Sequence, residues 1–154
     1  MLNRRIARVV ALQALYACEI AGEDAIETTL DYVARMHECD EDQVKYAHYL
    51  LKIALQEIES LDEDIRNHTA NWALDRISAI DRNILRLALC ELRCCSQDAP
   101  FKVVIDEAVE IAKEYGSPDS GKFVNGIIDS VYKAYTKSDI RKESTADGTN
   151  AQKV

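Results

Sequence analysis

The spacing of apolar residues is the feature that most limits what this chain can fold into. Along most of the sequence these residues recur at intervals of three and four, which places them on one side of an α-helix. Runs in which apolar and polar residues alternate, as in a half-buried strand, are missing, and the 154 residues include five Gly and two Pro. We therefore expect an all-α fold, with six to seven helices packed as two small helical bundles.

The first half of the chain contains three periodic segments. One helix is predicted from Arg4 to Ile20 and a second from Ala25 to Met36. Residues 44–65 carry apolar side chains at a seven-residue repeat, which indicates a narrow seam packed against neighbouring helices. A break around residues 59–62 is expected to divide this third segment in two.

The second half predicts three helices, each with a start signal. Ser78 is a plausible N-cap for the helix that contains AIDRNILRLALCELR. Pro100 opens a helix that should end at Tyr115, just before a glycine. Ser117 and Pro118 then supply an N-cap and a first-turn proline for the last helix.

Residues 1–137 are expected to form one helical domain with two sub-bundles, at roughly 1–75 and 76–137. From 138 to 154 the sequence is polar and has no apolar periodicity. Such a segment cannot bury enough apolar surface to offset the entropy of ordering it. We therefore expect a disordered C-terminal tail over residues 138–154.

The charge balance limits how the protein can meet nucleic acid. Lys and Arg number 19 against 27 Asp and Glu, which gives a formal net charge of −8. A protein that binds nucleic acid over its whole surface through positive charge is therefore excluded. Any RNA site must be local.

The cysteines and the hydropathy indicate a cytoplasmic protein. The five cysteines lack the paired spacing of a disulfide framework or a zinc finger, which favours a reducing compartment. No run approaches eighteen apolar residues, so we expect neither a membrane span nor a secretory signal. We also expect no metal, no cofactor and no catalytic residues, because no Ser, His and Asp arrangement or glycine-rich cofactor loop emerges.

The first helix gathers positive charge in this otherwise acidic chain. On a helical wheel Arg4, Arg5, Arg8 and Tyr16 fall on one side. Guanidinium groups bind phosphate and a tyrosine ring can stack on an unpaired base, so this face would suit single-stranded RNA. The alternative is a solvated helix end with Tyr16 in the core, and the spacing alone favours that alternative.

Residues 116–123, GSPDSGKF, contain the spacing GxxxxGK of a phosphate-binding loop. The hydroxyl residue that such a loop needs after its lysine is replaced by Phe123, and the preceding EAVEIAKEY is helical rather than a strand. Nucleotide hydrolysis is therefore not expected. What remains is a helix start with Lys122 and Phe123 in its first turn, which could hold a phosphate or a stacked base, unless Phe123 packs into the core.

Two further clusters on the helix after Ser78 have simple interpretations. Arg82, Arg86 and Arg93 share one side of the helix and could form a contact face, but we interpret them as a solvated stripe. Cys90 and Cys94 lie one turn apart, yet no matching pair of metal ligands accompanies them. They are expected to be packing or surface residues.

Three blocks of sequence, taken together, resemble the NusB family of transcription antitermination factors. They are RRIARVVALQALY, DRISAIDRNILRLALCEL and PFKVVIDEAVEIAKEYGSPDSGKFVNGIIDSV, in the order of the family. The resemblance implies a fold of two three-helix bundles. It also implies binding to the boxA element of nascent RNA together with ribosomal protein S10, in a complex with other Nus factors on RNA polymerase that suppresses termination in ribosomal RNA operons.

The resemblance also implies two RNA-binding patches and a partner surface. The first patch lies on the first helix, and the second at the start of the last one. The implied RNA-binding residues are Arg4, Arg5, Arg8, Gln13 and Tyr16 in the first patch and Asp119, Ser120, Lys122, Phe123 and Asn125 in the second. Weaker candidates for the S10 surface, or for its edge with RNA, are Asp81, Arg82 and Arg86.

Two other functions stay open at this point. The chain could be a self-associating helical module without RNA binding, in which a homodimer covers the arginine face. It could also be an enzyme, because the same helical domain stands at the front of certain ribosomal RNA cytosine methyltransferases. The sequence stops before any methyltransferase domain, so we expect a stand-alone factor.

Overall fold

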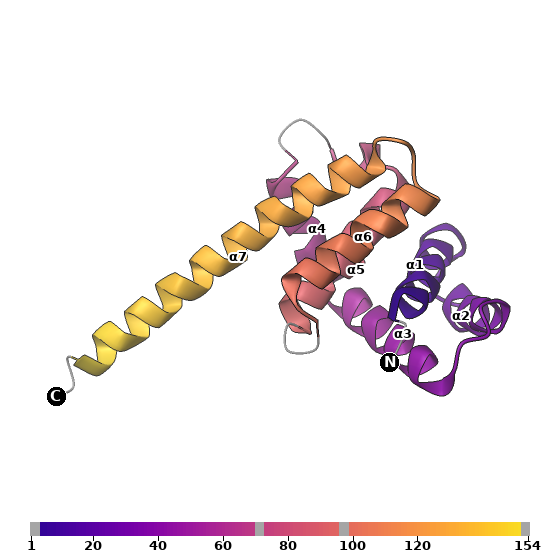
Figure 1. Ribbon diagram of the computed structural model, residues 1–154, viewed down its shortest axis with the longest axis horizontal. Coiled ribbons are helices and arrows are strands. Elements are labelled where there is room, and N and C mark those ends of the chain that lie inside the picture. The colour runs from indigo at the N-terminus through magenta and orange to yellow at the C-terminus, as the bar shows by residue number, and fades with distance from the viewer. Residues whose placement is uncertain (1–3, 70–72, 96–98, 152–154) are drawn as a thin grey trace.

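The computed structural model describes residues 4–69, 73–95 and 99–151, with side chains as far as residue 137. Within these ranges the chain forms α-helices and one short 3-10 helix, and no strand (Figure 1). The elements are α1 (Arg4–Ala21), α2 (Ala25–Met36), α3 (Glu41–Gln56), α4 (Ile58–Asn67), η1 (Leu74–Arg76), α5 (Ala79–Cys94), α6 (Phe101–Tyr115) and α7 (Ser120–Ala151).

The helices pack as two bundles, which confirms the predicted fold class. In the first bundle α1 lies against α2 and α3, and in the second α5, α6 and α7 pack against one another. The two bundles meet where α5 contacts both α1 and α3 (Figure 1). The buried apolar residues of both bundles belong to one continuous core.

Local chemistry explains where α1 ends and where α3 begins. Gly22 adopts a positive φ of 91° after α1, a conformation that glycine reaches without steric cost. Asp40 starts α3 with a capping box, because its carboxylate accepts a hydrogen bond from the backbone of Gln43, whose side chain accepts one from the backbone of Asp40. The predicted bounds of α1 and α2 agree with the structure to within a residue.

The break in the third segment lies earlier than predicted. Helix α3 ends at Gln56 and α4 begins at Ile58, so the break lies at Glu57, whereas the sequence placed it around residues 59–62. The repeat continues across it, since Leu61 and Ile65 on α4 are both fully buried. The break lets α4 turn away from α3 and pack against α5 and α7.

The second bundle is built around α5. The Ser78 side chain accepts a hydrogen bond from the backbone of Asp81, as expected of an N-cap. Helix α5 is buried on more sides than its apolar stripe suggested, because Asn83, Arg86 and Glu91 are also buried. Within the second bundle, α5 is therefore covered by α6 and α7 and also by α1, α3 and α4.

The last helix differs from its prediction at both ends. It begins at Ser120 and not at Ser117 or Pro118, which form a turn before it. Its backbone stays helical as far as Ala151 and projects away from the other helices, where the sequence predicted a disordered tail from 138 (Figure 1). The segment lacks glycine and proline until Gly148, so its local propensity permits a helix although its pattern offers no face to bury. The division into sub-bundles and tail stays a prediction about independent folding units.

Candidate nucleic-acid interface

The three arginines at the start of α1 are held in three different ways. The Cζ atom of Arg4 lies 4.5 Å from the centre of the Tyr46 ring, a cation–π contact between α1 and α3. Arg5 reaches α6, where its Nε and Nη2 atoms donate to the Glu107 carboxylate at 2.5 and 3.0 Å. This hydrogen-bonded pair raises the pKa of Arg5 and lowers the pKa of Glu107. The Arg5 side chain stays 47% exposed, so it can still be reached from solvent.

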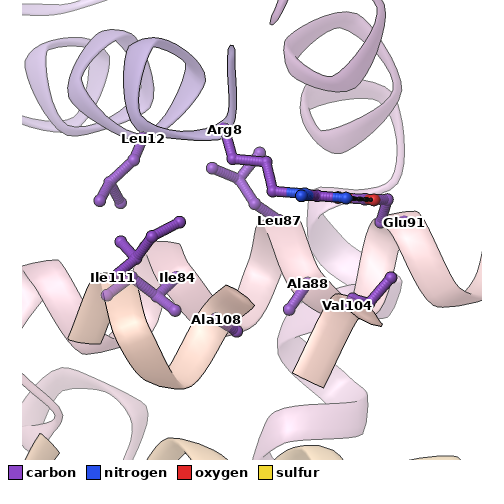
Figure 2. Close-up of a pocket in the computed structure, with 9 residues that line it drawn as sticks. All are labelled: Arg8, Leu12, Ile84, Leu87, Ala88, Glu91, Val104, Ala108 and Ile111. Atoms are coloured by element: carbon purple, nitrogen blue, oxygen red, sulfur yellow. Dashed lines mark hydrogen bonds and ion pairs between the residues drawn. The ribbon is translucent and has the colours of Figure 1, made fainter. Parts of the chain in front are cut away.

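Arg8 points inward. Its Nε and Nη2 atoms donate to the two oxygens of Glu91 on α5 at 2.8 and 2.6 Å, and the two side chains are 9% and 2% exposed (Figure 2). Burial on its own would lower the pKa of Arg8, but the hydrogen bonds and charge of Glu91 outweigh it and raise the pKa. The expected contact between Arg8 and RNA phosphate is therefore not supported, because the guanidinium is already satisfied inside the protein.

A small cavity lies beside the Arg8–Glu91 pair, between α1, α5 and α6. Figure 2 shows apolar side chains such as Leu12, Ile84 and Ile111 around it. Its volume is about 20 Å³, close to the space that a single water molecule needs. The cavity is therefore too small for a cofactor.

Gln13 and Tyr16 complete the first predicted patch on α1. Both side chains are half-buried. Tyr16 therefore does not occupy the fully buried core position that the alternative interpretation of the sequence gave it. Arg5, Gln13 and Tyr16 share one side of α1 and remain accessible, and we call these three residues the α1 face. Arg4 is also accessible, but it lies on the side of the helix that meets Tyr46.

The second predicted patch surrounds the start of α7. Asp119, Lys122 and Asn125 are exposed, and Phe123 is half-buried and packs against the core with part of its ring. Phe123 therefore packs into the core with part of its ring, while the rest stays accessible, and its contact with a base stays a prediction. Ser120 is only 1% exposed, so it shapes the patch from inside.

The turn before α7 is closely packed. The Ser120 Oγ atom accepts a hydrogen bond from the Ser117 backbone at 2.9 Å. A Cβ atom added at Gly116 would collide with the Ser120 side chain and would come within 2.7 Å of the Ala112 carbonyl oxygen. Gly116 is therefore required by close approach rather than by a phosphate, and helix α6 stands where a phosphate-binding loop would have a strand.

A surface pocket of about 250 Å³ joins the start of α5 to the start of α7. Arg76, Ser78 and Asp81 line it on one side, and Ser117, Asp119, Ser120 and Phe123 on the other. Asp81, which the resemblance assigned weakly to the partner surface or to its edge with RNA, thus lines a pocket next to the second predicted patch.

The first turn of α5 also connects this pocket to α1. Arg82 Nη2 donates to the Glu19 carboxylate at the end of α1, and Asn83 Nδ2 donates to the other oxygen of Glu19 at 3.0 Å. Asp81 in the pocket is the neighbour of Arg82 in the chain. The first turn of α5 therefore contacts the end of α1 and also lines the pocket at the start of α7.

The arginines of α5 do not form the solvated stripe that the sequence predicted. Arg86 is buried, and its guanidinium donates to Asp62 on α4 at 2.7 and 2.9 Å. Arg82 also donates to the carbonyl of Ile77 at 2.8 Å, and Arg93 donates to Asp64 on α4 at 3.1 Å. These arginines hold α5 to its neighbours, and Arg86 in particular has little surface left for a partner.

Sequence reasoning missed the carboxylates that hold these arginines. Glu19, Asp62, Glu91 and Glu107 each lie on another helix, far along the chain from the arginine that they bind. In a chain with 27 acidic residues nothing in the pattern marks these four. A buried position for Glu91 could have been suspected, since it follows an apolar run within ALCEL.

The cysteines agree with their interpretation as packing or surface residues. Burial raises the pKa of the Cys90 thiol, and Cys94 is exposed. Within the part of the chain that the structure describes, no three His, Cys, Asp or Glu side chains gather so as to hold a metal ion. No described helix combines the length and apolar character needed to cross a membrane.

The fold and this surface define a class of protein: a small all-helical domain of two bundles, with accessible cationic and aromatic side chains on α1 and at the start of α7. The model of the NusB family matches residues 5–133. The transcription antitermination protein NusB of Desulfitobacterium hafniense is 38% identical over 145 residues, which cover 94% of this chain and 97% of that protein. The chain belongs to the NusB family.

Solved structures of the family are similar as well. NusB of Thermotoga maritima, at 36% identity, covers 86% of this chain and 92% of its own with a TM-score of 0.78. A structure of the antitermination factors NusB and NusE in complex with double-stranded RNA contains a chain that is 31% identical, with a TM-score of 0.76 over 88% of this chain and 100% of that one.

Proposed function

We propose that this protein is an RNA-binding antitermination factor that binds boxA RNA of ribosomal RNA operon transcripts together with ribosomal protein S10, and joins other Nus factors on RNA polymerase. The observation that carries the proposal is the similarity, over 88% of the chain, to a protein solved with NusE and RNA. The α1 face and the accessible residues around Phe123 add the local chemistry that such a role needs.

Within the proposed site the residues have two kinds of role. The α1 face, together with Lys122, Phe123 and Asn125, contacts RNA through cationic, aromatic and amide groups. Asp119, which is exposed, belongs to the same patch, and its carboxylate lowers the net positive charge there. Arg8 and Ser120 are positioning residues, because both are buried and bonded within the protein.

The net charge of −8 supports the need for a cationic partner. Most of an acidic surface repels RNA, so a basic protein such as S10 would both complete the binding surface and offset that repulsion. The mechanism is assembly rather than catalysis: the protein supplies a rigid two-bundle support on which RNA and partner are held side by side.

The test is the binding of a fluorescent boxA RNA and a scrambled control, with and without S10, over a series of salt concentrations. We expect selective binding that S10 strengthens and that weakens by about 0.7 log units per log unit of salt for each phosphate contacted. Absence of RNA binding in both conditions would contradict the proposal. A concentration-dependent dimer in that case would favour the self-associating module instead.

A further inference from the structure

Helices α2 and α3 leave an open groove between them in the first bundle. Both helices pack against α1, but they make few contacts with each other. The groove between them has a volume of about 550 Å³. It shares no residue with either predicted RNA patch or with the candidates for the S10 surface. The groove is therefore a surface that the proposed function does not use.

The floor of the groove is apolar. Ile26 on α2 and Leu51 on α3 are 8% and 3% exposed, and Leu55 beside them is half-buried. Tyr49 on α3 also lines the groove and is 42% exposed. An apolar floor between two helices is the kind of surface that receives the apolar face of a further helix.

The two edges of the groove carry opposite charges. Glu23 and Glu27 lie four residues apart along the α2 edge, and Lys45 and Lys52 lie seven residues apart along the α3 edge. All four side chains are exposed. Seven helical residues span about 10 Å, so the charged edge of α3 follows the groove for about two helical turns.

Contacts within the protein do not neutralise these edges. Lys45 lies 3.4 Å from Glu41, and His48 lies 3.9 Å from Glu27. Each of these four side chains is at least 42% exposed, and ion pairs in such positions contribute little free energy. The edges can therefore form new ion pairs with a bound molecule.

The chemistry of the groove decides between possible occupants. A nucleic-acid strand does not fit, because Glu23 and Glu27 would repel its phosphates. The end of the chain does not fit either, since residues 138–154 have no apolar repeat and α7 projects away from α2 and α3 (Figure 1). An amphipathic helix supplies both an apolar stripe and charged flanks.

We propose that this groove binds an amphipathic helix of a further protein partner. The apolar stripe of that helix lies on Ile26, Leu51 and Leu55. Its basic flank meets the glutamates of the α2 edge, and its acidic flank meets the lysines of the α3 edge. Because the two edges differ in charge, the helix enters the groove in one direction only. The site is separate from the proposed RNA site, so the partner can bind while RNA and S10 are held.

The test uses three synthetic helices of about 20 residues, a length at which a designed peptide can be helical. All three have the same leucine stripe. The first has Lys along one flank and Glu along the other. The second has the same composition with Lys and Glu mixed on both flanks, so that it fits the groove in neither direction. The third has Lys on both flanks.

Fluorescence anisotropy measures the affinity of each peptide for the wild type and for two double variants. Lys45→Glu with Lys52→Glu makes both edges of the groove acidic. The matched control is Lys133→Glu with Lys137→Glu, which makes the same change of charge at exposed positions on α7, outside the groove.

The wild type and the control should bind the first peptide about tenfold more tightly than the second, as expected of a few exposed ion pairs. This difference should shrink as salt is added. The groove variant should lose the preference and should bind the third peptide about tenfold more tightly than the wild type does. Because this result is a gain of binding, it also shows that the variant is folded.

Four results would overturn the proposal. The first is that the wild type binds the first two peptides equally or not at all. The second is that the control gains as much affinity for the third peptide as the groove variant, so that only overall charge matters. The third is displacement of the first peptide by S10, which would make the groove part of the S10 surface. The fourth is a wild-type dimer in sedimentation that the groove variant dissociates, which would make a second copy the occupant.

The proposed function is decided by a separate measurement. Binding of boxA RNA with S10 should be the same in the wild type and in the groove variant, because the groove contains no residue of the predicted RNA patches. If the wild type binds boxA RNA and shows no preference among the peptides, only the partner site fails. If it binds no RNA and prefers the first peptide, only the proposed function fails.

Discussion

The guanidinium of Arg8 on α1 and the carboxylate of Glu91 on α5 face each other through two hydrogen bonds of 2.8 and 2.6 Å inside the protein. The pair joins the first bundle to the second at the level of the α1 face. An arginine that the sequence resemblance assigned to RNA binding is therefore bonded inside the protein, where it holds α1 to α5.

Replacing Arg8 by Ala should lower the free energy of unfolding by about 3–5 kcal/mol, because a buried carboxylate is left without its partner. Urea denaturation followed by circular dichroism measures this. The double variant Arg8→Met with Glu91→Leu removes both charges and should recover most of the loss. If this double variant folds but its RNA binding has a salt slope reduced by about 0.7, then Arg8 contacts a phosphate after all.

Replacing Arg5 by Ala should weaken RNA binding and reduce its salt slope by about 0.7, the value for one phosphate contact on single-stranded RNA. The free energy of unfolding should change by less than about 1 kcal/mol, since the Arg5–Glu107 pair lies at the surface. Glu107→Gln should instead strengthen RNA binding, because it removes a carboxylate that competes with phosphate. Fluorescence anisotropy over a salt series measures both variants.

The matched control for Arg5 is Arg66→Ala. Arg66 is an exposed arginine on α4 that is paired with Glu63 at 3.3 Å, on a helix outside both predicted RNA patches. Its replacement should leave the salt slope unchanged. Equal effects of the Arg5 and Arg66 variants would mean that only overall charge matters and that the α1 face is not the site.

Replacing Phe123 by Leu should weaken RNA binding by about 1–3 kcal/mol, the usual contribution of one base stacked on an aromatic ring. Leucine keeps most of the apolar contact with the core, so thermal unfolding should change little. Replacement by Ala should add a loss of stability, because the ring is partly packed. An unchanged affinity of the Leu variant would show that Phe123 serves packing only.

The Arg5–Glu107 pair should make stability depend on pH in the acid range. The hydrogen bond and charge of Arg5 hold the pKa of Glu107 below its ordinary value of 4.5. The unfolded chain therefore takes up this proton first, so the contribution is present above pH 4.5 and is lost as the pH falls through the pKa of the folded state.

Urea denaturation of the wild type and Glu107→Gln from pH 7 to pH 3 checks this dependence. The difference in the free energy of unfolding should be at most about 1 kcal/mol, because solvent screens the pair, and should shrink below pH 4.5. Arg5→Ala should show the same narrowing. A difference that grows toward low pH would contradict the assigned direction of the pKa shift.

The positions of the helices could be predicted from the sequence more closely than the contacts that each helix makes with the others. The bounds of α2 and the N-cap at Ser78 could be predicted because apolar spacing and capping groups act within a few residues. The break at Glu57 and the burial of α5 on several sides could not, because both depend on which helices pack across them.

Part of the candidate site could likewise be predicted from the sequence, and part of it could not. The α1 face and the patch around Phe123 were indicated by residue types at helical spacing and by a specific family resemblance. The inward direction of Arg8 and the position of Asp81 in the pocket beside Phe123 were not visible, since each involves residues on helices that are distant in sequence.

By itself, the sequence determined the all-α fold class and the starts of most helices, because these follow from side-chain periodicity and capping along the chain. It also indicated the family, through the resemblance of three blocks of sequence. Only the tertiary structure decided which arginines are exposed and which are bonded inside. The local sequence around an arginine or a carboxylate is compatible with both an exposed and a buried position. The position is decided only when the two bundles pack around the pair and remove water from it.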